Sequence, residues 1–249
     1  MLLRTSHHSK DNMTKQLAFV FLVCISVLSC REKLPVDGIN ASSPVLFRFS
    51  PGDYFSFDNW KLDVYRQRIQ SSYFRNSWTV ADTGRAMRGW TRVAIVIDST
   101  FDATNRLVRR DSLLFRSGDD GDVYQWGFLK ALIAERETLN LAPQWDRIAV
   151  FSQPLGSSWV IARIDTSIGG RTNETIYGRI LTTREYVGPL IINGEERAIL
   201  SYRIEITKSR LDYTFWLTDS PTSIAKVLDD SETLRNSTLR ELKVIRTRQ

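Results

Sequence analysis

Histidine and cysteine are almost missing from this sequence, which holds two of each in 249 residues. His7, His8 and Cys24 lie within the first 29 residues, Cys30 follows, and residues 31–249 contain neither type. Serine–histidine and cysteine–histidine catalysis, disulfide bonds, and zinc or haem sites with histidine or cysteine ligands are therefore excluded there. Carboxylate, lysine, serine and tyrosine chemistry remains open, but the balance shifts away from enzymes. We predict a protein with no catalytic residues and no cofactor.

A hydrophobic run long enough to span a membrane is also missing. The most apolar stretch, residues 17–28, has twelve residues, whereas a membrane-spanning helix needs about 20. Three cations and one acid precede it, and small residues follow it. A charged start, a short apolar core and a small-residue end are typical of a secretory signal peptide. We therefore predict that residues 1–29 are a leader, with a buried helix or an uncleaved anchor as the alternative.

The end of this leader resembles the bacterial lipobox. Val27, Leu28, Ser29 and Cys30 place an aliphatic residue three positions before a cysteine and a small residue directly before it. The resemblance implies cleavage after Ser29 and acylation of Cys30, which would anchor the protein to a membrane of the bacterial cell envelope. Arg31 stands where an aspartate would imply retention at the inner membrane, so the outer membrane is favoured.

The remainder divides into a tether and one domain. Residues 30–44 contain two prolines, one glycine and no apolar periodicity, which predicts a flexible lipidated tether. Residues 45–249 are long enough for a single β-rich domain. The leader takes three of the 34 basic and one of the 28 acidic residues, leaving 31 and 27. These charges are scattered, and the expected compartment lacks nucleic acid, so no nucleic-acid partner is predicted.

The patterning of the domain predicts a mainly β fold. Alternating or β-branched runs recur every 8–14 residues, and Asn193-Gly194 is a strong hairpin signal. One segment, 127–141, has helical periodicity. These features predict an antiparallel meander that forms an open or half-closed β-barrel with one or two short helices. The predicted strand segments are 61–70, 89–99, 111–128 as a hairpin, 157–165, 175–187, 190–206 as a hairpin, 211–217, 223–230 and 239–246.

The order of lipobox, tether, long antiparallel strands and one helix is similar to the extracytoplasmic half-barrel lipoproteins of the LolA/LolB type. The resemblance implies a curved sheet around a helix, with a cavity that binds acyl chains. From strand alternation, Trp90, Val93 and Tyr213 are predicted to line such a cavity. The protein is then a non-enzymatic binding or scaffolding module for an apolar small molecule. The alternative is a structural subunit of an envelope assembly, with an envelope protein as partner.

Other motifs in the sequence have simpler structural explanations. Asp82 begins an Asp-Thr-Gly triplet like that of aspartic proteases, but no second triplet is present, so a loop between strands 77–82 and 89–98 is favoured. Asp119, Asp120 and Asp122 lack the spacing of a calcium loop, and a solvated hairpin tip is expected with no metal site. Ten aromatic residues within 47–78 either fill a core or line a cavity, and the sequence leaves this open.

Overall fold

A computed structural model describes residues 48–134, 142–164, 174–208, 211–219, 222–231 and 237–248. The leader, Cys30, the tether and the second half of the predicted helix lie outside these residues. No helix in the described ranges is both long and apolar enough to cross a membrane. The elements are β1 (Tyr54–Leu62), β2 (Arg68–Met87), β3 (Trp90–Phe101), β4 (Leu107–Ser117), β5 (Val123–Trp126), α2 (Phe128–Ala134), β6 (Trp145–Ala149), β7 (Ser158–Ile164), β8 (Glu174–Ile192), β9 (Glu195–Lys208), β10 (Leu211–Asp219), β11 (Thr222–Ser231) and β12 (Thr238–Arg246).

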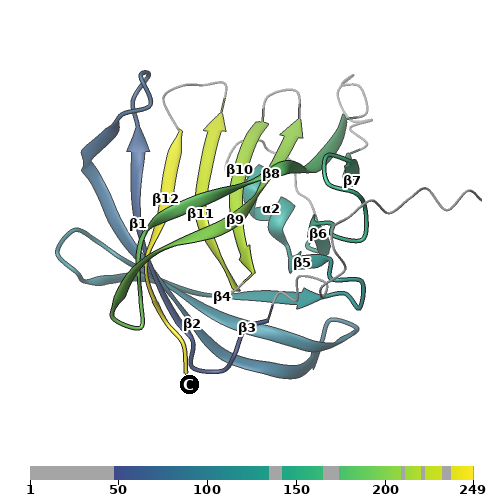
Figure 1. The fold of residues 1–249 in the computed structure, drawn as a ribbon, viewed down its shortest axis with the longest axis horizontal. Coiled ribbons are helices and arrows are strands. Elements are labelled where there is room, and N and C mark those ends of the chain that lie inside the picture. The colour runs from purple at the N-terminus through teal and green to yellow at the C-terminus, as the bar shows by residue number, and fades with distance from the viewer. Residues whose placement is uncertain are drawn as a thin grey trace, which may run out of the picture. The chain divides into compact units, whose positions relative to one another are not determined.

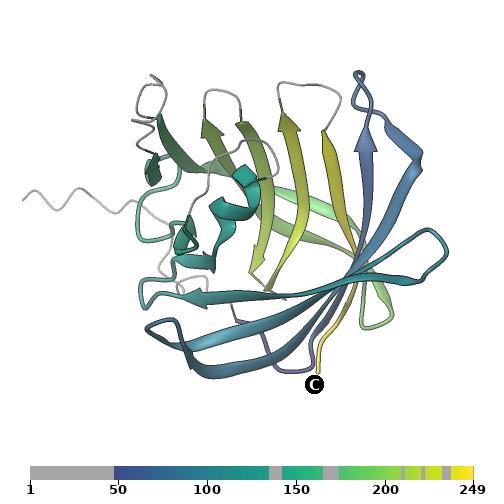
Figure 2. The same cartoon turned by 180° about the vertical axis from the view of Figure 1, so that it is seen from behind.

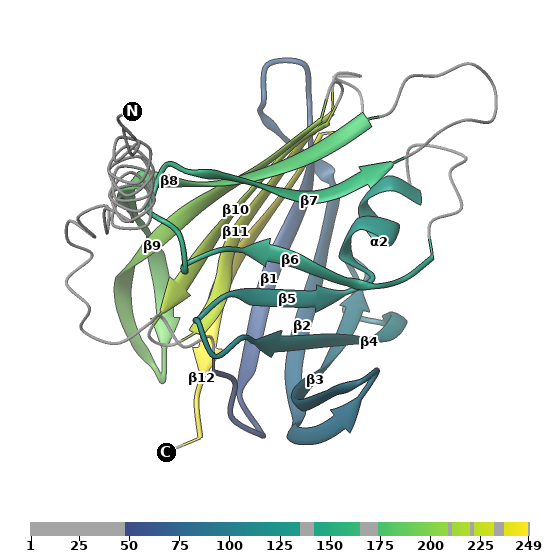
Figure 3. The same ribbon diagram turned by 90° about the vertical axis from the view of Figure 1, so that its right-hand side faces the viewer.

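The strands form one sheet in the order β6-β5-β4-β3-β2-β1-β12-β11-β10-β9-β8-β7. Neighbours in this order run antiparallel, and β1 pairs with β12 to join the two ends of the meander. A parallel contact between β12 and β8 makes β8 to β12 a partial ring. The sheet is therefore strongly curled, as Figure 1 shows, and Figure 3 shows β4, β5 and β6 side by side at one end. The predicted antiparallel, half-closed β fold is confirmed.

Aromatic side chains fill the inner face of the curl, which we call the core face. Phe55, Phe57, Trp78 and Phe115 are buried on it, and the Phe57 and Trp78 ring centroids lie 4.9 Å apart. The Trp78 and Phe115 centroids are separated by 5.8 Å. Burial of each such side chain contributes about 1.5–3 kcal/mol. The open question about the aromatic residues within 47–78 is settled for Phe55, Phe57 and Trp78, which belong to the core.

The helix lies on the inner side of the curl (Figure 2). Its Phe128 ring packs edge-on against Tyr213 of β10, with 5.5 Å between centroids. Asp146 of β6 accepts a hydrogen bond of 2.8 Å from the backbone N–H of Leu129 in the first turn. Burial raises the pKa of Asp146, although hydrogen bonds from Leu129, Gln144 and Phe128 oppose the shift. The helix thus begins where the sequence predicts one.

Two predicted segments differ in the structure. The strand expected at 61–70 was wrong, because β1 ends at Leu62 and β2 begins at Arg68. Asp63 accepts backbone hydrogen bonds from Tyr65 and Gln67 at 2.9 and 2.8 Å, which stabilises a turn. The loop expected after residue 82 was also wrong, since β2 continues to Met87. Register shifts on either side of Asp82 let the strand accommodate turn-like residues.

The Asn193-Gly194 hairpin is confirmed between β8 and β9. Both residues have positive φ, 50° and 93°, as a two-residue turn of this kind requires. The Asn193 side chain accepts a hydrogen bond of 2.9 Å from the backbone N–H of Thr247 and donates one of 2.9 Å to its hydroxyl oxygen. The hairpin is thereby attached to the residues that follow β12.

Candidate functional site

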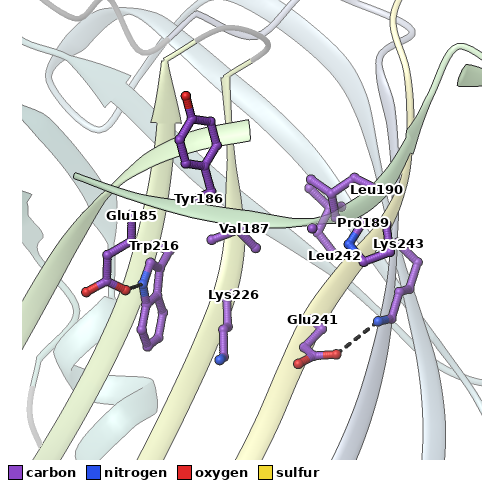
Figure 4. A pocket seen from close by; sticks show the side chains of 11 residues that line it. Glu185, Tyr186, Val187, Pro189, Leu190, Trp216, Lys226, Glu241, Leu242 and Lys243 are labelled. Atoms are coloured by element: carbon purple, nitrogen blue, oxygen red, sulfur yellow. Dashed lines mark hydrogen bonds and ion pairs between the residues drawn. The ribbon is translucent and has the colours of Figure 1, made fainter. Parts of the chain in front are cut away.

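Strand β8 crosses over the outer face of β10, β11 and β12 (Figure 1), and a pocket lies at this crossing (Figure 4). We call the crossing segment, residues 185–190, the strap. The strap passes close to β9 at Gly188. A Cβ atom there would lie 2.9 Å from the Cα atom of Ala198, so this position requires glycine. The pocket has a volume of about 150 Å³. Its lining residues are Glu185, Tyr186, Val187, Gly188, Pro189, Leu190, Trp216, Lys226, Glu241, Leu242 and Lys243.

Strand register explains why a polar row forms the floor of this pocket. Trp216 pairs with Lys226, and Lys226 pairs with Glu241, so the three side chains form a row across β10, β11 and β12. Their neighbours Phe215 and Val227 are buried on the core face. Because successive residues in a strand point to opposite faces, the row faces outward. The strap then covers it.

Trp216 is the aromatic side chain of this floor and is only 6% exposed. Its indole N–H donates a hydrogen bond of 2.7 Å to Glu185 on the strap (Figure 4). The ammonium of Lys226 lies 4.9 Å from the centroid of the indole, within the range of a cation–π interaction. Arg203 of β9 lies 3.5 Å from Glu185, so that carboxylate has a cationic partner as well.

Glu241 is the second carboxylate of the pocket, and its side chain is 17% exposed. Its carboxylate lies 2.9 Å from the Lys243 ammonium and 2.7 Å from the guanidinium of Arg68. Desolvation by burial raises the pKa of Glu241. The hydrogen bond from Lys243 and the charges of Lys243, Arg68 and Lys226 outweigh burial, so the pKa lies below its ordinary value. Glu241 is therefore an ionised structural partner of the surrounding cations.

The three residues predicted to bind a ligand lie outside this pocket. Trp90, in β3, is 46% exposed, and the Arg116 guanidinium lies 3.3 Å from its ring centroid. Val93 is fully buried in the same strand. Tyr213 packs on the helix through Phe128. Nothing here tests their proposed role in ligand binding, which stays a prediction.

Asp82 is held by its own strand. Its carboxylate accepts hydrogen bonds from the Gly84 backbone N–H at 3.0 Å and from Arg85 Nε at 2.7 Å. These two hydrogen bonds lower the pKa of Asp82. In an aspartic-protease dyad two carboxyl groups share one proton, whereas the contacts of Asp82 are with Gly84 and Arg85 of its own strand.

The aspartate-rich hairpin between β4 and β5 contains a buried residue that the sequence prediction missed. Asp119 and Asp120 are exposed as predicted, but Asp122 is fully buried, so the expectation of a solvated tip was wrong for it. The Asp122 carboxylate pairs with Arg147 and accepts backbone hydrogen bonds from Phe151 and Ser152. In the described part of the chain, no group of three or more residues offers a histidine, cysteine or carboxylate metal site.

The sequence prediction did not identify the pocket. Alternation in 211–217 and 223–230 places Trp216 and Lys226 outward, and that signal was available. Nothing in the local pattern shows that residues 185–190 fold over them.

No protein-family model matches this chain, and no curated protein matches it. A crystal structure of a provisionally named exported protein with a YmcC-like fold, from Bacteroides fragilis, is 9% identical, covers 81% of this chain and 99% of its own, and has a TM-score of 0.42. A provisionally named lipoprotein from Parabacteroides distasonis is 7% identical, with coverages of 79% and 95% and a TM-score of 0.41. With TM-scores this low, neither likeness carries an argument about this protein.

Proposed function

We propose that this chain is an extracytoplasmic lipoprotein of a bacterial cell envelope, anchored through Cys30 and favouring the outer membrane, and that it acts as a non-enzymatic binding module. The anchor is supported by the lipobox at residues 27–30 and the leader before it. The binding role rests on one observation, the pocket of about 150 Å³ beneath the strap.

The walls of this pocket indicate a polar ligand group. Two carboxylates, two ammonium groups and one indole line it, whereas acyl-binding cavities have predominantly apolar walls. The aromatic rings of the core face pack on one another at 4.9–5.8 Å between centroids. The strap pocket therefore supports binding of a polar small molecule rather than the acyl chain that the LolA/LolB resemblance implies.

The anchor is tested by Cys30→Ala. Metabolic labelling with a clickable fatty acid should mark the parent protein and leave the variant unmarked. The variant should also leave the membrane fraction or accumulate as an uncleaved precursor. Labelling of the variant equal to that of the parent would contradict acylation at Cys30.

The binding role is tested by native mass spectrometry of the mature anchored protein, purified in an uncharged detergent. We expect a small molecule to be retained by the parent and lost from Lys226→Trp, where an indole would fill the pocket. Retention of a fatty acid by both proteins would instead support the cavity predicted around Trp90, Val93 and Tyr213. If neither protein retains a small molecule, the binding module is refuted and the structural-subunit alternative stands.

A further inference from the structure

The charges around the strap pocket are unequal. Four cations, Lys226, Lys243, Arg68 and Arg203, surround two carboxylates, Glu185 and Glu241. A further carboxylate, Glu205, lies 3.1 Å from Arg203 and is also paired with Arg179 at 2.8 Å. The lining itself is balanced, but the outer cations neutralise its two carboxylates. The pocket therefore carries a local excess of positive charge.

Ion pairs and hydrogen bonds engage both carboxylates of the pocket, whereas the ammonium of Lys226 has no ion pair among the described residues. Glu241 is engaged by Lys243 and Arg68, at 2.9 and 2.7 Å. Glu185 is engaged by the Trp216 indole N–H and by Arg203. For Lys226 the structure records a contact with the Trp216 ring and a charge interaction with Glu241, the residue opposite it on β12, but within the described ranges no ion pair.

Lys226 stands between Trp216 and Glu241 on the floor of the pocket (Figure 4). A lysine ammonium has three N–H donors and no acceptor, and a ring face satisfies it only in part. An acceptor oxygen entering the pocket would meet these donors. An added cation would instead meet Lys226 and Lys243, with both carboxylates already neutralised. The charge arrangement favours an anion.

Size restricts which anion fits. Pockets that take drug-sized ligands measure about 300–1,000 Å³, so about 150 Å³ admits a single small group. Carboxylate and phosphate groups are of this size, and both form charge-assisted hydrogen bonds with lysine. The carboxylates of Glu185 and Glu241 in the lining disfavour a ligand with several negative charges.

We propose that the strap pocket is an oxyanion site, in which Lys226, supported by Lys243, binds the carboxylate or phosphate group of a small ligand against the indole of Trp216. This assignment rests on the proposed binding function and specifies its ligand class. The oxyanion belongs either to a free solute or to a lipid headgroup, which share this chemistry.

Isothermal titration calorimetry on the mature anchored protein in uncharged detergent tests the assignment. The probes are inorganic phosphate, acetate, a short-chain phosphatidic acid, and methylammonium as a cationic control. We expect binding of at least one oxyanion, a weaker affinity as sodium chloride rises, and no binding of methylammonium. Lys226→Met, which retains the stem of the side chain and removes the charge, should weaken binding about tenfold. The matched control is Lys130→Met, because Lys130 is an exposed lysine on α2.

The outcomes separate this proposal from the proposed function. Binding of phosphate or acetate indicates a free solute, and binding of the phosphatidic acid alone indicates a headgroup; either supports the assignment if Lys226→Met loses it. Oxyanion binding that Lys226→Met retains would overturn the assignment, as would binding of methylammonium or absence of any oxyanion binding. The binding module would survive these results if native mass spectrometry still shows a molecule that Lys226→Trp loses.

Discussion

Replacement of Asp122 by alanine tests how much a fully buried carboxylate and its hydrogen bonds stabilise the fold. The carboxylate is fully buried, and its two oxygens accept hydrogen bonds from Arg147, from the backbone N–H groups of Phe151 and Ser152 at 2.7 and 3.0 Å, and from the Ser152 hydroxyl at 3.1 Å. It thereby connects the β4–β5 hairpin to the residues that follow β6. Truncation leaves two backbone donors without an acceptor and removes the anion opposite Arg147.

The cost follows from the nature of these contacts. Breaking a buried ion pair by removing one partner costs about 3–5 kcal/mol, because the remaining groups lose their compensation. Arg147 is one-third exposed and also lies 3.7 Å from Asp120, so part of its charge can be solvated or paired again. We therefore expect a loss of about 3 kcal/mol for Asp122→Ala. A typical folded domain is stable by about 5–15 kcal/mol, so the variant should still fold.

Urea denaturation followed by tryptophan fluorescence measures this loss. With an m-value of about 2–3 kcal/mol per M, the midpoint should fall by about 1–1.5 M. Asp119→Ala is the matched control at the exposed end of the same hairpin, and its free energy of unfolding should remain within about 0.5 kcal/mol of the parent. A loss below about 1 kcal/mol for Asp122→Ala, or equal losses for both variants, would refute the argument that the buried carboxylate holds the hairpin in place.

Three further predictions address packing, titration and catalysis. Gly178→Ala should destabilise the fold by about 1–3 kcal/mol, since its Cβ atom would lie 2.3 Å from the Trp159 ring; Gly84→Ala, whose Cβ atom meets nothing closer than 3.9 Å, is the control, and equal denaturation midpoints would contradict this. The lowered pKa of Glu241 stabilises the folded state at pH values above the pKa of this group in the unfolded chain, near 4.3. This stabilisation disappears as pH falls through the lower folded-state pKa. Glu241→Gln should therefore reduce the loss of unfolding free energy on acidification, and an unchanged acid dependence would count against the stabilisation of Glu241 by its surrounding cations. Asp82→Asn should leave the fold and ligand retention unchanged, whereas a pepstatin-sensitive peptidase activity in the parent that this variant lacks would reverse our view of the residue.

Local sequence features determined the β architecture. The Asn193-Gly194 dipeptide specifies its turn because both residues tolerate positive φ, and the structure has them at 50° and 93°. The apolar runs on either side of residues 118–122 likewise specify the β4–β5 hairpin. The helix begins at Phe128, inside the predicted segment. Each of these signals acts over a few residues, so the sequence alone contains it.

The sequence predictions were wrong where the hydrogen-bond partners of a polar side chain determined the local structure. Asp63 looked like part of an alternating strand, but its carboxylate caps a turn. Asp122 looked like a solvated tip residue, but Arg147 and the backbone around Ser152, about 30 positions later, bury and satisfy it. Composition and spacing show the charge of such a residue and not its partner.

The candidate site shows most clearly which features local sequence determines and which depend on long-range pairing. Strand alternation alone determined that Trp216 lies on the face opposite Phe215 and that Lys226 lies on the face opposite Val227, because the side-chain period of a strand is two residues. Whether that face meets solvent or is covered depended on the strap, which reaches it only because the end of β8 pairs with β12, more than fifty residues later. Long-range pairing of this kind leaves no periodic signal in the covered strands. The tertiary structure therefore decided that an outward polar row became the floor of a pocket.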